Sequence, residues 1–257
     1  YNNIPAVITA ALVTGCDAIH PGYGFLAENA YLAEICQQVG VTFIGPPPDV
    51  IEKMGNKAEA RKVMKAAGVP LLPGTQGIVP TLTQAREAAR EIGYPVVIKA
   101  VAGGGGRGMR VATNDAELAR FYPVAQSEAE SAFGNGDVYI ERYLTKPRHV
   151  EVQVLGDQYG NVVAVGDRDC SLQRRPQKVV EEAPAPHLSP KVRERLLRTA
   201  EKGAKAAKYW SAGTLEFLLD SNGDFFFMEM NTRIQVEHPV TEEVTSLDLV
   251  GWQIRVA

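Results

Sequence analysis

Acidic and amide side chains recur in residues 216–237, where two apolar runs flank Asn222-Gly223. Asn-Gly is the preferred pair for a two-residue type I′ turn, so this segment predicts an antiparallel hairpin. With only those two residues in the loop, Glu216 lies directly opposite Glu229. Facing carboxylates repel each other and weaken a sheet. A dication between them removes the repulsion, and oxygen ligands of this kind favour Mg²⁺ or Mn²⁺.

The second half of this segment alternates in polarity. If the chain stays extended, one face carries the apolar side chains of Phe226, Met228 and Met230. The opposite face then carries Glu229, Asn231, Arg233, Gln235 and Glu237. A hairpin whose polar face meets water is the alternative. A face of acids, amides and an arginine favours a metal and phosphate site.

A second candidate site is the glycine-rich loop at 99–110, which follows the apolar run 96–98. Its glycines match Gly-x-Gly-x-x-Gly, but a strand follows the loop, which excludes the dinucleotide fingerprint, and no Gly-Lys-Ser/Thr is present. A glycine flap between two strands lets backbone N–H groups approach phosphate oxygens. Lys99 adds a positive charge beside it. The alternative is a surface hairpin without a ligand.

The composition is that of an ordinary globular protein, with 257 residues, 45% hydrophobic and 22% charged. A net charge of −3 argues against a general binder of nucleic acid or anionic membrane. Three cysteines without a Cys-x-x-Cys indicate neither a disulfide framework nor a zinc site. No apolar run approaches the length of a membrane span. We expect a cytoplasmic protein, with an organelle matrix or stroma as alternatives.

The predicted elements change in character along the chain. Alternating helices and strands in the first 50 residues indicate a parallel β-α-β sheet. A compact α+β unit follows, and after it an antiparallel section. The predicted helices are 4–14, 28–38, 50–54, 57–67, 83–92, 115–130 and 190–208, and the predicted strands are 17–20, 41–44, 95–99, 109–112, 137–141, 148–156, 162–170 and 177–182.

Taken together, the motifs resemble an ATP-grasp ligase, and specifically the biotin carboxylase component of biotin-dependent carboxylases such as acetyl-CoA carboxylase. The resemblance runs along nearly the whole chain. The segments that carry it are 20–29 (HPGYGFLAEN), 99–110 (KAVAGGGGRGMR), 148–153 (RHVEVQ), 168–175 (RDCSLQRR), 177–184 (QKVVEEAP) and 229–242 (EMNTRIQVEHPVTE). It implies a mixed α/β and α+β architecture: an ATP-grasp domain at 51–257 with a mobile lid at about 72–142, preceded at 1–50 by the end of a Rossmann-like domain.

The reaction that the resemblance implies joins ATP, bicarbonate and biotin to give carboxybiotin through carboxyphosphate, with Mg²⁺ or Mn²⁺. Glu216, Glu229 and Asn231 would hold the metals. The implied ATP-binding residues are Lys57, Lys99, Gly105, Gly106, Glu141, Arg142, Tyr143, Leu144, His149, Gln173, Glu216 and Glu229. Lys178, Arg233 and the backbone N–H of Val236 would bind bicarbonate. Glu237 would remove its proton, because bicarbonate is a poor nucleophile until it is deprotonated.

The resemblance also implies partners: a biotin carboxyl carrier, a carboxyltransferase and a second copy in a homodimer. The family has a histidine that contacts the nucleotide where this chain has Pro176, so that contact is lost. Tyr1 at the start and an apparent helix running into Ala257 lead us to expect an excerpt of a longer protein. Two alternatives stay open: another ATP-grasp ligase, such as one that forms carbamoyl phosphate, or a silent ATP-binding fragment.

Overall fold

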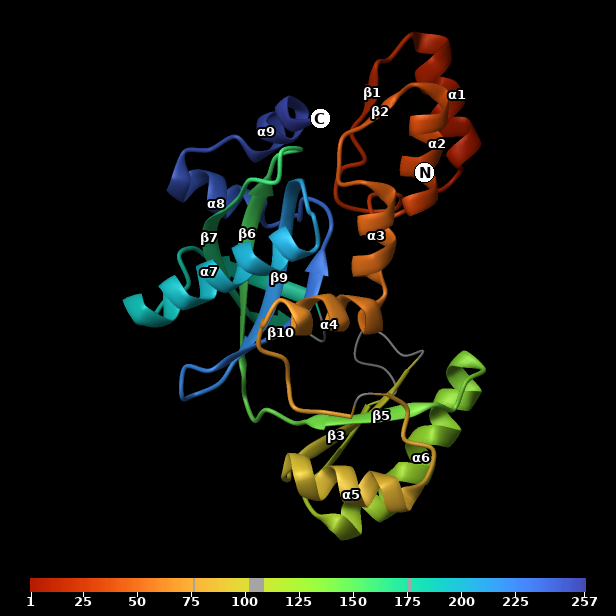
Figure 1. The fold of residues 1–257 in the computed structure, drawn as a ribbon, viewed down its shortest axis with the longest axis vertical. Coiled ribbons are helices and arrows are strands. Elements are labelled where there is room, and N and C mark those ends of the chain that lie inside the picture. Colours follow the sequence, from red (N-terminus) through yellow and green to blue (C-terminus); the bar gives the residue numbers. More distant parts are fainter. Residues whose placement is uncertain (76, 102–108, 175–176) are drawn as a thin grey trace. The chain divides into compact units, whose positions relative to one another are not determined.

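The computed structural model describes residues 1–75, 77–101, 109–174 and 177–257. By its internal contacts the chain divides into two compact units. The first contains residues 1–71, 148–173 and 178–257, and the second contains 72–147 and 174–177. Figure 1 shows the course of the chain through both units, and each is described by itself.

The first unit begins with the expected parallel β-α-β arrangement. Helices α1 (Ile4–Thr14) and α2 (Ala30–Val39) accompany the short strands β1 (Ala18–Ile19) and β2 (Thr42–Phe43), which pair in parallel. Asn29 caps α2 by accepting a hydrogen bond from the backbone of Leu32. Two further helices follow, α3 (Pro48–Gly55) and α4 (Lys57–Ala66), and Asn56 caps the second of them.

A five-stranded sheet forms the centre of the first unit, with the strand order β10-β9-β6-β7-β8. One face of this sheet packs in a core of aliphatic and aromatic side chains that includes Val150, Phe217 and Phe227, together with α4 and α7. The strands are β6 (Arg148–Gly156), β7 (Val162–Arg174), β8 (Gln177–Glu182), β9 (Ser211–Leu219) and β10 (Phe225–Asn231).

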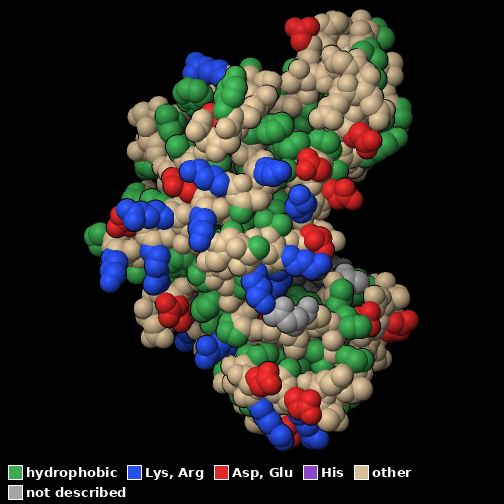
Figure 2. Space-filling model, viewed as in Figure 1, with side chains coloured by type: hydrophobic (Ala, Val, Ile, Leu, Met, Phe, Trp, Pro, Cys, Tyr) green, Lys and Arg blue, Asp and Glu red, His purple; other side chains and the backbone are tan. Residues whose placement is uncertain are grey.

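Helix α7 (Pro190–Ala206) presents one apolar face to this sheet and one charged face to solvent. Leu196 and Ala200 are buried in the core, as the helical period predicts. Its exposed cations are Lys191, Arg195, Arg198, Lys202 and Lys205. Figure 2 shows Lys and Arg side chains gathered over this helix. The chain then ends with the short helices α8 (His238–Thr245) and α9 (Leu249–Val256).

The hairpin of β9 and β10 differs from its prediction at the turn. The loop contains three residues, Ser221–Gly223, because the backbone N–H of Asp220 donates to the carbonyl of Asp224 at 2.8 Å. The Asp220 carboxylate also accepts the backbone N–H groups of Asn222 and Asp224, and Gly223 adopts φ +83°. This shifts the register by one residue. A β-bulge between Phe227 and Glu229 shifts it back, so Glu229 does pair with Glu216.

The bulge also changes which side chains face the core. Phe226 and Met228 were expected inside, but Met228 is 37% exposed and Phe226 is only partly buried. Phe227, at 2% exposure, takes the core position instead. Beyond the bulge Met230 is buried, as predicted, at 4% exposure. The strict alternation failed because one extra residue inverts the facing of every side chain on one side of it.

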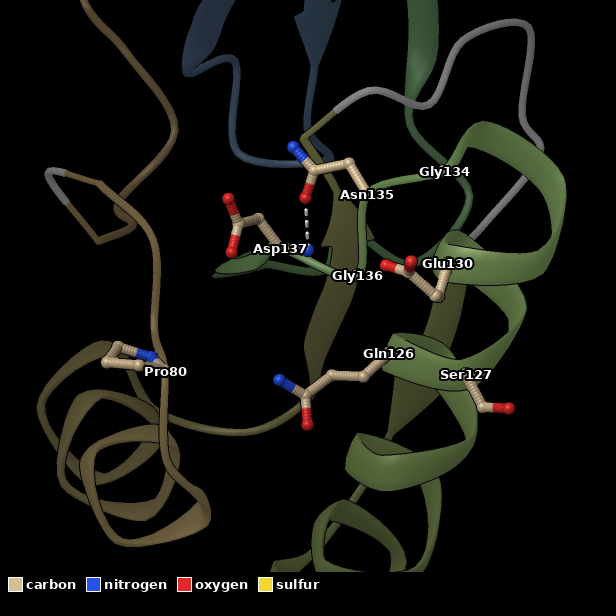
Figure 3. A pocket seen from close by; sticks show the side chains of 8 residues that line it. All are labelled: Pro80, Gln126, Ser127, Glu130, Gly134, Asn135, Gly136 and Asp137. Atoms are coloured by element: carbon tan, nitrogen blue, oxygen red, sulfur yellow. Dashed lines mark hydrogen bonds between the residues drawn. The ribbon is translucent and has the colours of Figure 1, made fainter.

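The second unit is a three-stranded antiparallel sheet with two helices. Its strands are β3 (Val96–Ala100), β4 (Met109–Ala112) and β5 (Val138–Arg142), in the order β4-β3-β5. Helices α5 (Leu82–Ile92) and α6 (Asp115–Phe133) pack on this sheet. A surface hollow lies between the end of α6 and the segment before α5 (Figure 3). It is lined by Pro80, Gln126, Ser127, Glu130, Gly134, Asn135, Gly136 and Asp137, none of which is a predicted site residue.

Within the described residues, no helix is long and apolar enough to cross a membrane.

Candidate active site

Four charged side chains lie side by side across the five-stranded sheet of the first unit. The register pairs Glu229 of β10 with Glu216 of β9, and Glu216 with Glu151 of β6. Glu151 in turn pairs with Arg168 of β7. Two facing carboxylates were predicted, and the structure has a row of three carboxylates that ends at an arginine. We call Glu229, Glu216 and Glu151 the acid row. Such a row needs cations to be stable, because like charges on neighbouring strands repel.

Lys178 is the cation that links most of these acids. From β8 its Nζ lies 2.5 Å from Glu151, 2.9 Å from Glu216 and 2.5 Å from Glu237. Burial opposes the charge on this lysine, but the carboxylates of Glu151 and Glu216 outweigh burial and raise its pKa well above the usual value. Lys178 is therefore a fixed positive charge between the acid row and Glu237.

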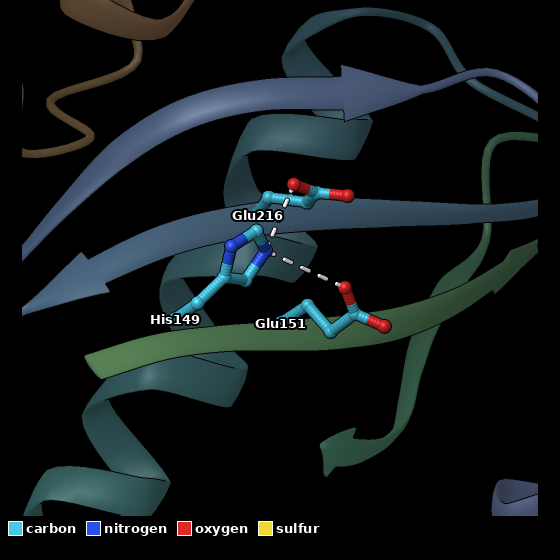
Figure 4. Close-up of side chains that lie close together, drawn as sticks. All are labelled: His149, Glu151 and Glu216. Atoms are coloured by element: carbon cyan, nitrogen blue, oxygen red, sulfur yellow. Dashed lines mark ion pairs between the residues drawn. The ribbon is translucent and has the colours of Figure 1, made fainter. Parts of the chain in front are cut away.

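His149 lies at the same place as a second cation (Figure 4). Its Nε2 is 2.9 Å from a Glu216 oxygen and 3.7 Å from Glu151. Burial opposes protonation, but the two carboxylates outweigh it and raise the pKa of His149 to about 9. The Nε2 of Gln173 lies 3.1 Å from His149 Nδ1, so the structure brings these two predicted nucleotide-binding side chains together.

Three of these residues, His149, Glu151 and Glu216, have ligand atoms close enough together to hold a metal ion. Both oxygens of Glu151 already have cationic partners, however. One accepts from Arg168 at 2.7 Å and the other from Lys178 at 2.5 Å. The carboxylates of this trio are therefore already neutralised by Arg168, Lys178 and His149, and a metal ion is not needed to balance their charge.

The pair of Glu216 and Glu229 fits a dication better. Burial, followed by the charge of Glu216, raises the pKa of the Glu229 carboxyl, and Lys57 opposes that rise. Burial opposes ionisation of Glu216 too, but the hydrogen bond from His149 and the charge of Lys178 hold the pKa of Glu216 at about 2. One of the two facing acids is thus well compensated and the other is not. A dication between them would supply the missing charge.

Asn231, the third predicted metal ligand, lies within reach of this pair. Its Nδ2 donates to Glu216 at 2.8 Å, and Gln235 Nε2 donates to the same oxygen at 3.0 Å. The Asn231 Oδ1 accepts from Arg233 at 3.0 Å. Metal ligation by Asn231 would therefore require its carboxamide to exchange these contacts.

The loop from β10 to α8 carries two of the three predicted bicarbonate-binding residues, Arg233 and Val236, and ends at the predicted base Glu237. Arg233 is held by Glu28, whose carboxylate lies 3.0 Å from Arg233 Nε and also accepts the backbone N–H of Thr232. Val236 is 58% exposed, whereas Glu237 is buried at 7% exposure and contacts Lys178. The structure thus brings Lys178 and Glu237 together, with Arg233 held on the same loop.

Of the other predicted nucleotide-binding residues, Lys57 begins α4 in the first unit, and the rest belong to the second unit. Lys99 of β3 forms an ion pair of 2.6 Å with Glu141 of β5. The N–H groups of Arg142 and Tyr143 donate to Pro73 and Pro95, so these two donors are engaged within the unit. Leu144 follows directly and is partly buried. The predicted phosphate-binding Gly105 and Gly106, and the substituted Pro176, lie outside the described residues.

Sequence reasoning assigned no role to Glu28, Glu151 or Arg168. Glu151 belongs to the run Val-Glu-Val-Gln-Val, which has the period of a half-exposed strand, yet its side chain is fully buried. Only the pairing of distant strands brings it beside Glu216 and Arg168. The alternating pattern therefore predicted exposure of Glu151, and nothing in the sequence of this strand identifies its partners.

Two protein families match the chain. Residues 56–257 match the family described as "Carbamoyl-phosphate synthase L chain, ATP binding domain". Residues 1–51 match the one described as "Biotin carboxylase, N-terminal domain".

Individual proteins are similar over the entire chain. It is 56% identical to the biotin carboxylase of Nostoc sp. and 57% identical to biotin carboxylase 1 of Bacillus subtilis. It covers 58% and 57% of their lengths, so the chain spans little more than half of these relatives. Among solved structures, a biotin carboxylase domain dimer of the Hydrogenobacter thermophilus 2-oxoglutarate carboxylase, in complex with MgADP, ADP and bicarbonate, is similar with a TM-score of 0.88. That match has 55% identity and covers 100% of this chain and 56% of the other.

Proposed function

The chain belongs to the biotin carboxylase family, which has the ATP-grasp fold, and on this basis we propose that it carries the ATP, metal and bicarbonate groups of an enzyme that carboxylates biotin. The reaction consumes ATP and bicarbonate and transfers the carboxyl group to biotin on a carrier. The single observation that best supports this is Lys178, which contacts Glu216 of the acid pair and Glu237 of the following loop at once. One cation thereby contacts both a proposed metal ligand, Glu216, and the proposed general base, Glu237.

Each residue then has a distinct task. Glu237 accepts the proton of bicarbonate, and the resulting dianion requires positive charge around it. Lys178 supplies a fixed charge, and the planar guanidinium of Arg233 suits a planar oxyanion. Glu28 orients that guanidinium through its contact with Arg233 Nε. The backbone N–H of Val236 is the proposed third donor to bicarbonate.

The nucleotide groups are assigned in the same way. Glu216, Glu229 and Asn231 would hold divalent metal, which neutralises the negative charge of the ATP phosphates when bound. His149 and Gln173, which contact each other, would meet the nucleotide, together with Lys57. In the second unit Lys99, Gly105 and Gly106 would bind phosphate, and residues 141–144 would line the adenine site. The relative from Hydrogenobacter thermophilus in complex with MgADP and bicarbonate supports this set of ligands.

We also propose the partners that such a reaction needs. A biotin carboxyl carrier must deliver biotin, and a carboxyltransferase must consume carboxybiotin. A homodimer is supported by the relative whose biotin carboxylase domain forms a dimer. The final acceptor would be chosen by the carboxyltransferase, so acetyl-CoA, propionyl-CoA and pyruvate are all compatible with the groups in this chain.

The test measures ATP hydrolysis by the full-length protein that contains this chain, with bicarbonate present and with free biotin added or omitted. We expect ATP turnover to depend on bicarbonate and to be stimulated by biotin, and radioactive bicarbonate to be incorporated into carboxybiotin. A matched reaction replaces biotin by ammonia. Because one matching family carries the description of carbamoyl-phosphate synthase, stimulation by ammonia and not by biotin would overturn the proposal in favour of that activity.

A further inference from the structure

The end of the acid row is occupied by Arg168, a residue that the proposed reaction does not use. Its side chain is completely buried, at 0% exposure, on the same sheet face as Glu151 and Glu216. Among the described residues it contacts neither of the two cations assigned to bicarbonate, Lys178 and Arg233. A buried arginine destabilises a fold unless every N–H donor has an acceptor.

All donors of this guanidinium are used. An arginine has five N–H groups, and Arg168 makes five hydrogen bonds with side-chain oxygens. Its acceptors are Glu151 (2.7 Å), Gln153 (2.9 Å), Thr241 (2.9 Å), Thr214 (3.3 Å) and Gln235 (3.2 Å). They come from β6, β9, the loop after β10 and α8, which are the elements that hold the site.

Two of these acceptors, Glu151 and Gln235, also contact residues assigned to the reaction. Glu151 gives one oxygen to Arg168 and the other to Lys178. Gln235 gives its Oε1 to Arg168, which leaves its Nε2 directed at Glu216, 3.0 Å away. Arg168 therefore decides which way both side chains point. Without it, the Glu151 carboxylate could rotate away from Lys178, and the Gln235 amide could turn over.

We propose that Arg168 is a positioning residue for bicarbonate activation, acting through Glu151 on Lys178 and through Gln235 on Glu216 and the loop that carries Glu237. This inference rests on the proposed function. It predicts a defect that is larger for bicarbonate than for ATP. Lys178 and the loop of Glu237 lose alignment, whereas Lys57 and the nucleotide groups of the second unit have no contact with Arg168 among the described residues.

The experiment compares Arg168→Lys and Arg168→Met in the full-length protein with the matched control Arg193→Met. The control also removes an arginine that pairs with an acid of β7, since Arg193 Nε donates to Asp167 at 2.9 Å, but it has no contact with the acid row in the described residues. We expect the Arg168 variants to raise the KM for bicarbonate or lower kcat by about 10- to 100-fold, while the KM for ATP rises severalfold less. Arg193→Met should lower the melting temperature alone.

Thr241→Val is a milder variant that tests the same proposal if the Arg168 variants fold poorly. It removes one acceptor of the guanidinium by an isosteric change and leaves the charge in place. A smaller defect of the same selective kind supports the proposal. Equal effects on the KM values of bicarbonate and ATP would overturn the proposal. Unchanged kinetics in both Arg168 variants and in Thr241→Val would overturn it too.

A crystal structure of the Arg168→Lys protein separates this proposal from the proposed function. We expect Gln235 Nε2 to leave Glu216, or Lys178 to leave Glu151, whatever reaction the wild-type protein catalyses. Side chains that keep their positions would refute the positioning role. Absence of biotin-dependent turnover in the wild-type protein, with these side chains displaced in the variant, would instead refute the proposed function alone.

Discussion

At the scale of single residues, the two facing acids are not equivalent. Glu229 has a raised pKa, so its charged form destabilises the metal-free fold, and this cost grows as the pH rises through that pKa. Glu216 has a pKa lowered to about 2, so its charge stabilises the fold above pH 4.5, and that stability is lost as the pH falls toward 2. Sequence reasoning treats the two alike, because it cannot see that Lys178 and His149 contact only one of them.

This asymmetry predicts opposite effects of two matched substitutions on stability. At pH 7 and without metal, Glu229→Gln should raise the free energy of unfolding by about 0.2–1 kcal/mol, the range of a cross-strand charge pair. Glu216→Gln should lower it by about 1–3 kcal/mol, because Lys178 and His149 lose a charged partner. Both should abolish Mg²⁺-dependent ATP turnover. Urea unfolding in EDTA measures the first effect, and shifts of the same sign in both variants would contradict the explanation.

Glu237 makes a separate prediction about the chemical step. Glu237→Gln should slow carboxybiotin formation by roughly 10²–10⁴-fold, as loss of a general base does, with little change in Mg-ATP affinity. Because its carboxylate also pairs with Lys178 at 2.5 Å, some loss of thermal stability is expected too. Single-turnover carboxylation and a melting curve separate the two roles. A variant that melts earlier yet turns over at a nearly normal rate would show that Glu237 is only an ion-pair partner.

At the scale of elements, the sequence predicted regular structure well and its interruptions poorly. The strands 148–156 and 177–182 and the helix 4–14 have the predicted bounds. In these elements the sequence pattern is regular, and turn or capping residues mark where each element begins and ends. The three-residue loop and the bulge at Met228 escaped prediction because each depends on local hydrogen bonds of Asp220 and on packing of Phe227, which an Asn-Gly pair does not reveal. The facing of Glu216 and Glu229 was predicted correctly only because these two irregularities cancel.

The observed loop makes its own prediction. Gly223 has φ +83°, a conformation that an alanine adopts at a cost of about 1–2 kcal/mol. Gly223→Ala should therefore lower the free energy of unfolding by that amount and leave the activity per folded molecule unchanged. Gly55→Ala is a matched control, because a Cβ there meets no atom within 4 Å and the glycine lies in helix α3. Equal stability of the two variants would contradict the positive φ of Gly223.

At the scale of the whole molecule, charge is distributed unevenly. The net charge is −3, yet α7 carries a row of exposed cations. This helix packs on one face of the five-stranded sheet, and the opposite face of the sheet carries buried acids. The cations Lys191, Arg195 and Arg198 of α7 are exposed, as the polar face of an amphipathic helix should be. The buried charges could be predicted only in part, since composition and period do not distinguish a buried acid from an exposed one. Long-range pairing of β6, β7 and β9 is what places Glu151, Glu216 and Arg168 together.

These buried charges predict how the stability of the metal-free protein depends on pH. His149 titrates near pH 6.5 when unfolded and near pH 9 when folded. Its contribution, about 3 kcal/mol, should be fully present below pH 6.5 and lost as the pH rises through about 9. The acids with lowered pKa values, Glu151, Glu216 and Asp169, contribute stability above pH 4.5 that is lost in acid. Maximal stability should therefore lie between about pH 5 and 6.5.

The measurement is urea unfolding in EDTA from pH 5 to pH 10, with His149→Asn compared to the wild-type protein at each pH. We expect the variant to be less stable at pH 6 and nearly equal to the wild type at pH 10, so the difference itself titrates. His187→Asn is the matched control for the substitution itself, because His187 is exposed and forms no ion pair among the described residues. A pH-independent difference for His149→Asn would mean that His149 has the same pKa in the folded and the unfolded protein, and would contradict the stabilisation of its protonated form by Glu151 and Glu216.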